Sequence, residues 1–142
     1  MAAVIRLRPR SAHPVTGACL CGNLRYEIEG NFASMSHCHC SMCRKHHGTP
    51  FATYVSTPIA GFRWVAGEGA LVHYRSSPFG IRAFCGVCGS VAPVLDFETG
   101  LALVPAGSLA GKLEVASQAH VFVASKASWH AISDHLPQHA EF

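Results

Sequence analysis

The sequence predicts a mostly β fold, a small sheet sandwich or tent with very little helix, on three observations. Short apolar segments recur along the chain and are separated by Gly and Pro, which is the pattern of short strands joined by turns. Several segments alternate apolar with polar residues, as strands with one buried face do. Two pairs of cysteines, at residues 19–21 and 85–88, are spaced to pin distant strands together.

The clearest strand is segment 23–30 (NLRYEIEG), because its apolar residues alternate with charged ones. Segments 71–76 (LVHYRS) and 81–85 (IRAFC) are expected to pair through the connection SPFG, which would deliver Cys85 to a strand end. The remaining expected strands are, in chain order, 51–57, 62–67, 91–97, 101–107 and 120–125.

Helix is expected over Ser41–His47, where Ser41 can cap the first turn and Gly48 can end the last. Segment 125–137 (SKASWHAISDHLP) is expected to hold one further helical turn. Its three large apolar side chains are expected in the core: Trp129, Ile132 and Leu136.

Length and composition indicate one domain. A chain of 142 residues can bury a modest core of its own, and we expect that domain to span residues 15–142. Residues 1–14 carry three arginines and no acid and are expected to form a flexible leader. No apolar run reaches the roughly 20 residues that span a bilayer, and the N-terminus lacks a secretory signal, so a cytoplasmic location without membrane contact is expected.

The seven cysteines divide by spacing into a set of four and a set of three. The set of four consists of two tight turns, CLCG and CGVCGS, each with glycine after its second cysteine. Glycine provides the backbone freedom that lets two sulfurs converge on one ion, and two such half-sites make a closed structural zinc site. The set of four is Cys19, Cys21, Cys85 and Cys88.

The set of three lies in the stretch SHCHCSMCRKHHGTP, as Cys38, Cys40 and Cys43. Three protein ligands with an open fourth position are typical of catalytic zinc, whereas structural sites are closed. Two zinc ions per chain are therefore expected.

The alternative is that a nearby histidine closes this site. His37 and His39 alternate with the cysteines, so in an extended segment they face the opposite side. His46 and His47 lie about one helical turn beyond Cys43 and are better placed to approach the metal.

The formal net charge of +3 does not point to nucleic acid. Two zinc ions on seven thiolates would lower the charge by three units, to near zero, and no block of like charge exists. Nucleic acid is therefore not an expected partner. The oligomeric state stays open.

From Gly17 to Pro137 the chain resembles the glutathione-dependent formaldehyde-activating enzyme family, which also includes the domain of centromere protein V. The segments that carry the resemblance are GACLCGNLRYEIEG, HCHCSMCRKHHGTPF, FCGVCGS and HVFVASKASWHAISDHLP. The resemblance implies a β-tent fold, with a structural zinc on the four-cysteine set and a catalytic zinc on the three-cysteine set. It also implies a carbon–sulfur lyase activity, the addition of glutathione or a related thiol to formaldehyde or another small aldehyde.

Around the implied catalytic zinc, His46 or His47 is expected to donate a proton to the developing alkoxide. Arg44 and Lys45 are expected to meet a carboxylate of glutathione, although a solvated helix face is an alternative role for both. Arg82 is a further cation that could arrive on the strand leading to Cys85.

Two other classes of function remain open on the sequence. One is a zinc-stabilised binding module without catalysis, in which both metals are structural. The other is a thiol redox enzyme that uses Cys38 and Cys43 as a dithiol. The fourth position of the three-cysteine site separates the first from an enzyme, because a binding module would fill that position with a protein ligand.

Overall fold

The computed structural model describes residues 14–29 and 32–142, which form three β-sheets and one α-helix. The leader predicted over residues 1–14 lies outside the described residues, apart from its last position. The mostly β composition with very little helix confirms the predicted fold class. None of the helices in the described segments has the length and apolar character that crossing a lipid bilayer requires.

The strands of the described residues belong to three groups. The first sheet has the order β1-β2-β5, with β1 (Val15–Ala18), β2 (Arg25–Ile28) and β5 (Phe62–Ala66). The second has the order β10-β3-β4-β9-β8, with β10 (Gln118–Val121), β3 (Ser34–Cys38), β4 (Ala52–Pro58), β9 (Leu101–Pro105) and β8 (Val94–Asp96). The third is the hairpin of β6 (Leu71–Ser77) and β7 (Gly80–Cys85).

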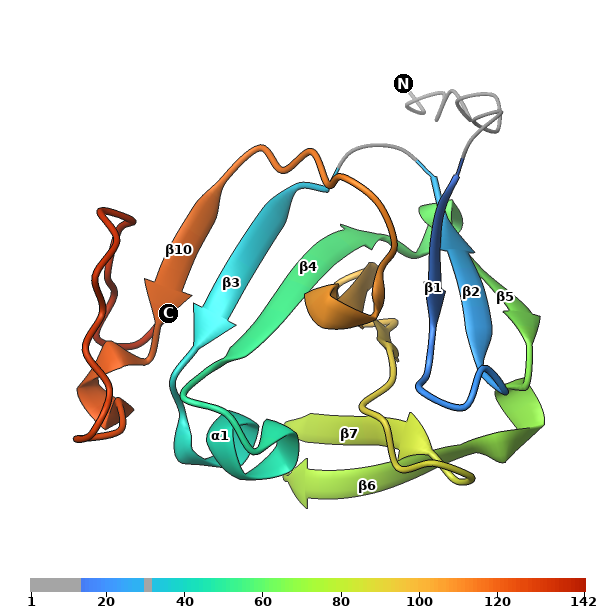
Figure 1. The fold of residues 1–142 in the computed structure, drawn as a ribbon, viewed down its shortest axis with the longest axis horizontal. Helices are drawn as coiled ribbons and strands as arrows, with labels where there is room; N and C mark the ends of the chain where they lie inside the picture. Colours follow the sequence, from blue (N-terminus) through green and yellow to red (C-terminus); the bar gives the residue numbers. More distant parts are fainter. Residues whose placement is uncertain (1–13, 30–31) are drawn as a thin grey trace.

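The hairpin lies across one end of the other two sheets, and α1 lies beside it (Figure 1). All pairings in the first two sheets are antiparallel except β10 with β3, which is parallel and sets Val121 opposite Cys38. The described residues also contain four short 3₁₀ turns: η1 (Ile59–Gly61), η2 (Glu68–Ala70), η3 (Ala106–Ser108) and η4 (Val123–Ser125).

The main core lies between the first two sheets. On β2 the expected alternation holds, because Tyr26 and Ile28 are buried while Arg25 is exposed. Tyr26 packs its ring 5.7 Å from Phe62 and 5.6 Å from Trp64, both on β5. Buried side chains of β4 and β9 close the same cluster, so the core joins the sheets that carry the two sets of cysteines.

Helix α1 runs over Ser41–His47 as predicted, and Gly48 ends it in the left-handed conformation, with φ of 65°. The predicted cap at Ser41 is wrong. Cys40 is the N-cap residue, and its sulfur accepts a hydrogen bond from the Cys43 amide at 3.3 Å. The reason is that the chain is still extended at Cys40, while Ser41 already has helical backbone and an exposed side chain.

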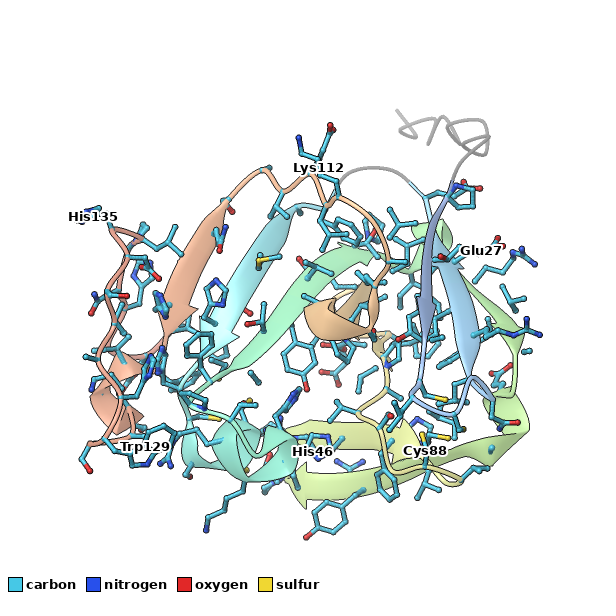
Figure 2. All side chains as sticks on the ribbon, in the orientation of Figure 1. Glu27, His46, Cys88, Lys112, Trp129 and His135 are labelled. Carbon is cyan, nitrogen blue, oxygen red and sulfur yellow. The ribbon has the colours of Figure 1, made fainter. Side chains whose placement is uncertain are left out.

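The helical turn predicted within residues 125–137 is also wrong. The 3₁₀ turn η4 ends at Ser125, and no helix follows it in the described chain. This C-terminal segment pairs with β10 instead, with His120 donating its amide to the Pro137 carbonyl. Trp129 is 71% exposed at the edge of the molecule, so the prediction of a core position fails for this residue (Figure 2). Ile132 and Leu136 are half-buried.

Candidate metal centres and the adjoining cleft

The four sulfurs of Cys19, Cys21, Cys85 and Cys88 lie within 4.8 Å of one another. The sulfur of Cys21 is 3.5 Å from that of Cys19 and 3.9 Å from that of Cys85. Sulfurs around a tetrahedral zinc ion, at 2.3 Å from the metal, would be about 3.8 Å apart. The cluster therefore fits a closed four-thiolate zinc site and joins the turn after β1 to the end of β7.

Two tight turns make this convergence possible. Gly22 and Gly89, the glycines that follow each pair of cysteines, have φ of 77° and 78°, a conformation that other residues adopt at a cost. Each turn directs a backbone N–H at a sulfur: Leu24 donates to Cys19 at 3.2 Å and Val87 donates to Cys85 at 3.4 Å. Burial raises the pKa of Cys19, but the hydrogen bonds from the Leu24 amide, Cys21 and Cys85 together outweigh burial, and the pKa is lowered overall.

The three sulfurs of Cys38, Cys40 and Cys43 form the second cluster, also within 4.8 Å of one another. Cys38 ends β3, Cys40 caps α1, and Cys43 lies buried in the first turn of that helix. Three thiolates in this arrangement could hold a zinc ion. The fold therefore groups the cysteines as their spacing predicted, into one cluster of four and one of three.

No fourth protein ligand joins the three sulfurs in residues 14–29 and 32–142. A His nitrogen or a carboxylate oxygen at the same mutual distance would extend the cluster, and none does. Each of the four histidines that could have closed the site lies elsewhere: His37, His39, His46 and His47. A zinc ion on these three sulfurs would therefore have no fourth protein ligand among the described residues.

A guanidinium from β7 contacts the three-cysteine cluster. Nη1 of Arg82 donates to the Cys43 sulfur at 3.2 Å, and Nε donates to the Ser76 hydroxyl at 3.2 Å. The pKa of Cys43 is lowered to about 5 by a hydrogen bond from Cys38 and, next, by the Arg82 cation. Three thiolates on one Zn²⁺ would carry one net negative charge, which the Arg82 cation would balance.

A cleft of about 440 Å³ opens at this cluster. Cys38, Cys40 and Cys43 line it together with Arg82 and Tyr54, and residues of β7, β9 and the segment after β10 contribute to the same lining. Clefts of this size accept small organic molecules. A ligand that enters this cleft meets the three sulfurs and the guanidinium together.

Tyr54 was not anticipated from the sequence. Its hydroxyl oxygen lies 2.8 Å from Nε2 of His47, and only the tyrosine of this pair lines the cleft. Burial raises the pKa of Tyr54 to about 12, with a further contribution from the nearby Cys43 sulfur. Burial, together with the neighbouring His46 and Arg82, lowers the pKa of His47 to about 4. At neutral pH the pair is therefore a neutral phenol against a neutral imidazole.

A chain of hydrogen bonds supports the metal-binding loop from its other side. The buried His39 lies between Cys38 and Cys40 and pairs its Nε2 with Nδ1 of His120 at 2.8 Å. Nε2 of His120 in turn lies 2.9 Å from the Asp134 carboxylate. Nothing in the sequence identified His120, 81 positions later in the chain, as the partner of His39, or Asp134 as the partner of His120.

The remaining predicted site residues lie on α1 outside the cleft lining. Arg44 donates from Nε to the His39 carbonyl at 3.3 Å, and Lys45 is exposed. His46 faces β7 (Figure 2), where burial and Arg82 lower its pKa. Arg44 and Lys45 do not line the cleft, whereas Arg82 does.

Comparison with known proteins identifies the family. The family described as "Glutathione-dependent formaldehyde-activating enzyme" matches residues 14–125. The fold is similar to a structural-genomics crystal structure of a protein from Rhodobacter sphaeroides, with a TM-score of 0.55 and 25% sequence identity over 70% of this chain and 98% of that one. No curated protein matches the chain. Because the family match spans most of the residues, including all seven cysteines, the chain belongs to the glutathione-dependent formaldehyde-activating enzyme family.

Proposed function

We propose that this protein is a zinc-dependent carbon–sulfur lyase and synthase that adds a thiol to a small aldehyde at the three-cysteine cluster. The observation that carries the proposal is the incomplete ligand set. Three sulfurs converge, no fourth side chain of the described residues joins them, and a cleft opens where that ligand would be. A binding module with two structural metals would need a closed site instead.

The reaction is R–SH + R′–CHO → R–S–CH(OH)–R′. A carbon–sulfur bond forms, the π bond of the carbonyl breaks, and the thiol proton ends on the new hydroxyl. The reverse direction is the lyase reaction. A zinc ion on the three thiolates would hold the thiol sulfur as thiolate beside the aldehyde, which supplies proximity and charge stabilisation.

Arg82 keeps the cluster electrically neutral. Its bond to Cys43 withdraws charge from that sulfur, which leaves the metal a stronger acceptor for an incoming thiol. The four-cysteine cluster has a different role in this proposal. It holds β7, the strand that presents Arg82, to the turn after β1.

In this proposal Tyr54 donates the proton to the alkoxide that develops on the aldehyde oxygen, and His47 orients the Tyr54 hydroxyl. The sequence suggested His46 or His47 as the donor, and in this proposal His47 acts through the tyrosine. The distance of 2.8 Å between the hydroxyl oxygen and Nε2 supports a hydrogen bond that orients the hydroxyl, while the tyrosine itself lines the cleft. General acid catalysis of this kind contributes roughly 10²- to 10⁴-fold to a rate.

Glutathione and formaldehyde are the thiol and aldehyde that family membership suggests. Arg44 and Lys45 remain the proposed contacts for a carboxylate of glutathione. Both follow Cys43 on α1 but do not line the cleft, so they could meet only the part of that thiol that lies outside the cleft.

The test is exchange between free formaldehyde and its thiol adduct, measured by two-dimensional NMR exchange spectroscopy with 2-mercaptoethanol and with glutathione. Wild-type protein should accelerate exchange, and Cys40→Ser should abolish the acceleration while the protein stays folded. Ser41→Ala is the matched control, because Ser41 is adjacent, exposed and not a ligand. No acceleration by fully metallated wild-type protein would favour the binding module.

A further inference from the structure

The walls of the cleft differ chemically from what glutathione needs. Large apolar side chains line most of it, among them Met42, Phe79, Ile81, Leu103 and Phe122. Several of these are exposed to a degree unusual for their size: Phe79 is 99% exposed and Met42 is 42% exposed. Exposed apolar side chains gathered around a cleft mark a surface that binds an apolar ligand.

The charged groups of the cleft are few. Among the described residues that line it, Arg82 is the single cationic side chain, and no acidic side chain lines it. The guanidinium already donates to Cys43 and Ser76. Glutathione carries two carboxylates and one ammonium group, and a charge buried without a partner is strongly unfavourable. The cleft therefore offers one cationic side chain for the two carboxylates of that thiol and no acidic side chain for its ammonium group.

We propose that the cleft selects a thiol whose body is an uncharged hydrocarbon group. This rests on the thiol–aldehyde addition proposed above and names the class of thiol. The sulfur would lie at the three-cysteine cluster, and the hydrocarbon would extend between Met42, Ile81 and Phe122 towards Phe79 at the β6–β7 turn. A volume of about 440 Å³ leaves room for a chain of several carbons beside the reacting aldehyde.

The test is a binding series that does not depend on turnover. The protein is loaded with ¹¹³Cd, and the resonance of the three-cysteine site is identified by its absence in Cys40→Ser. Ethanethiol, propanethiol, butanethiol and hexanethiol are then titrated against that resonance, with glutathione as the charged comparison. Affinity should rise about two- to fourfold for each added methylene, since each buries more apolar surface.

Two exposed phenylalanines provide matched variants. Phe79→Ser removes a side chain that lines the cleft. The increase in affinity from ethanethiol to hexanethiol should then be about tenfold smaller, while the affinity for ethanethiol itself should not change. Phe97→Ser removes one that is 79% exposed and does not line the cleft, so it should change neither affinity. Both side chains are largely exposed, so neither variant should unfold.

An affinity that does not change with chain length, or a glutathione affinity above that of butanethiol, would overturn the selection of an apolar thiol. The proposed function fails in a different way. Alkanethiols that shift the resonance with no acceleration of aldehyde exchange would overturn the addition reaction while supporting apolar selectivity. Exchange that is accelerated equally for every thiol would support the reaction and overturn the selectivity.

Discussion

Nη1 of Arg82 lies 3.2 Å from the sulfur of Cys43, and three residues further along the same strand Cys85 belongs to the other cysteine cluster. Strand β7 therefore links the two sites directly. At the end of the strand Cys85 belongs to the cluster of four sulfurs, and in its middle Arg82 presents a cation to the cluster of three. Because both residues lie on one strand, we expect the position of the Arg82 guanidinium to depend on the four-cysteine cluster.

Arg82→Ala should lower the metal affinity of the three-cysteine site by about 10- to 100-fold, the usual effect of removing a group that hydrogen-bonds a metal ligand. Competition with a chelator, followed by zinc release, measures this change. The four-cysteine site should keep its affinity. Arg75→Ala on the paired strand β6 is the control, because Arg75 contacts the Pro78 carbonyl instead of a cysteine. Equal zinc release from both variants would show that Arg82 does not contribute to the metal affinity of the three-cysteine site.

Protein purified without chelator should contain two zinc ions per chain, and Cys40→Ser should contain one. The reason is that the sulfurs form two separate clusters, one of four and one of three. Elemental analysis against protein concentration measures both values. One ion or fewer in wild-type protein would mean that the three-cysteine site does not hold zinc and that the enzyme proposal is wrong.

Cys19→Ser and Cys85→Ser should destabilise the fold far more than Cys40→Ser. Cys19 and Cys85 are buried in one cluster that ties residues more than 60 positions apart, and a structural zinc ion contributes roughly 10–16 kcal/mol of apparent binding energy. A typical fold has a total stability of only about 5–15 kcal/mol. Thermal melts of the three variants should fall into two groups. Identical melting would show that the two clusters are equivalent.

Tyr54→Phe should reduce the rate of aldehyde exchange by about 10²- to 10⁴-fold, because the variant keeps the ring and removes the proton donor. Thiol binding, read from the ¹¹³Cd resonance, should be retained. Tyr74→Phe is the matched control, since Tyr74 is 64% exposed on β6 and lies outside the cleft lining. An unchanged rate in Tyr54→Phe would return the role of proton donor to His46 or His47.

The ring of His47 should remain neutral well below pH 6.5. Burial lowers its pKa to about 4, whereas the unfolded chain has the ordinary value near 6.5. Between these two values the unfolded state binds a proton that the folded state does not, so the free energy of unfolding falls as the pH falls. Ring ¹³C and ¹⁵N shifts, assigned with His47→Gln, measure the titration. A midpoint near 6.5 would show that His47 is solvated and not held against Tyr54.

The sequence was informative where the signal is local. Cysteine spacing separated the two clusters, and the alternation around Tyr26 identified β2, because both patterns are set by neighbouring residues. Strand β3 has no such pattern: its sequence SMSHC is largely polar, and its pairing with β10 is parallel and joins residues more than 80 positions apart. The hydrogen bond between His39 and His120 depends on that pairing and could not be anticipated without it.

Two local expectations failed for a related reason. The cap of α1 is Cys40 because the extended chain of β3 continues almost to the helix, which only the sheet determines. Trp129 is exposed in a segment without helix, and the chain after it pairs with β10 by backbone hydrogen bonds at Pro137 and His139. Large apolar side chains near a terminus are not a reliable sign of a core when an unpaired strand edge is available to the segment.

The central claim is that the three-cysteine site accepts a thiol as its fourth ligand. The ¹¹³Cd spectrum of the doubly loaded protein tests it directly, because each site gives its own resonance. Addition of a thiol should shift the resonance that is missing in Cys40→Ser and leave the four-cysteine resonance unchanged. If neither resonance moves at saturating thiol, the site is closed, both metals are structural, and the protein does not add thiols to aldehydes by this chemistry.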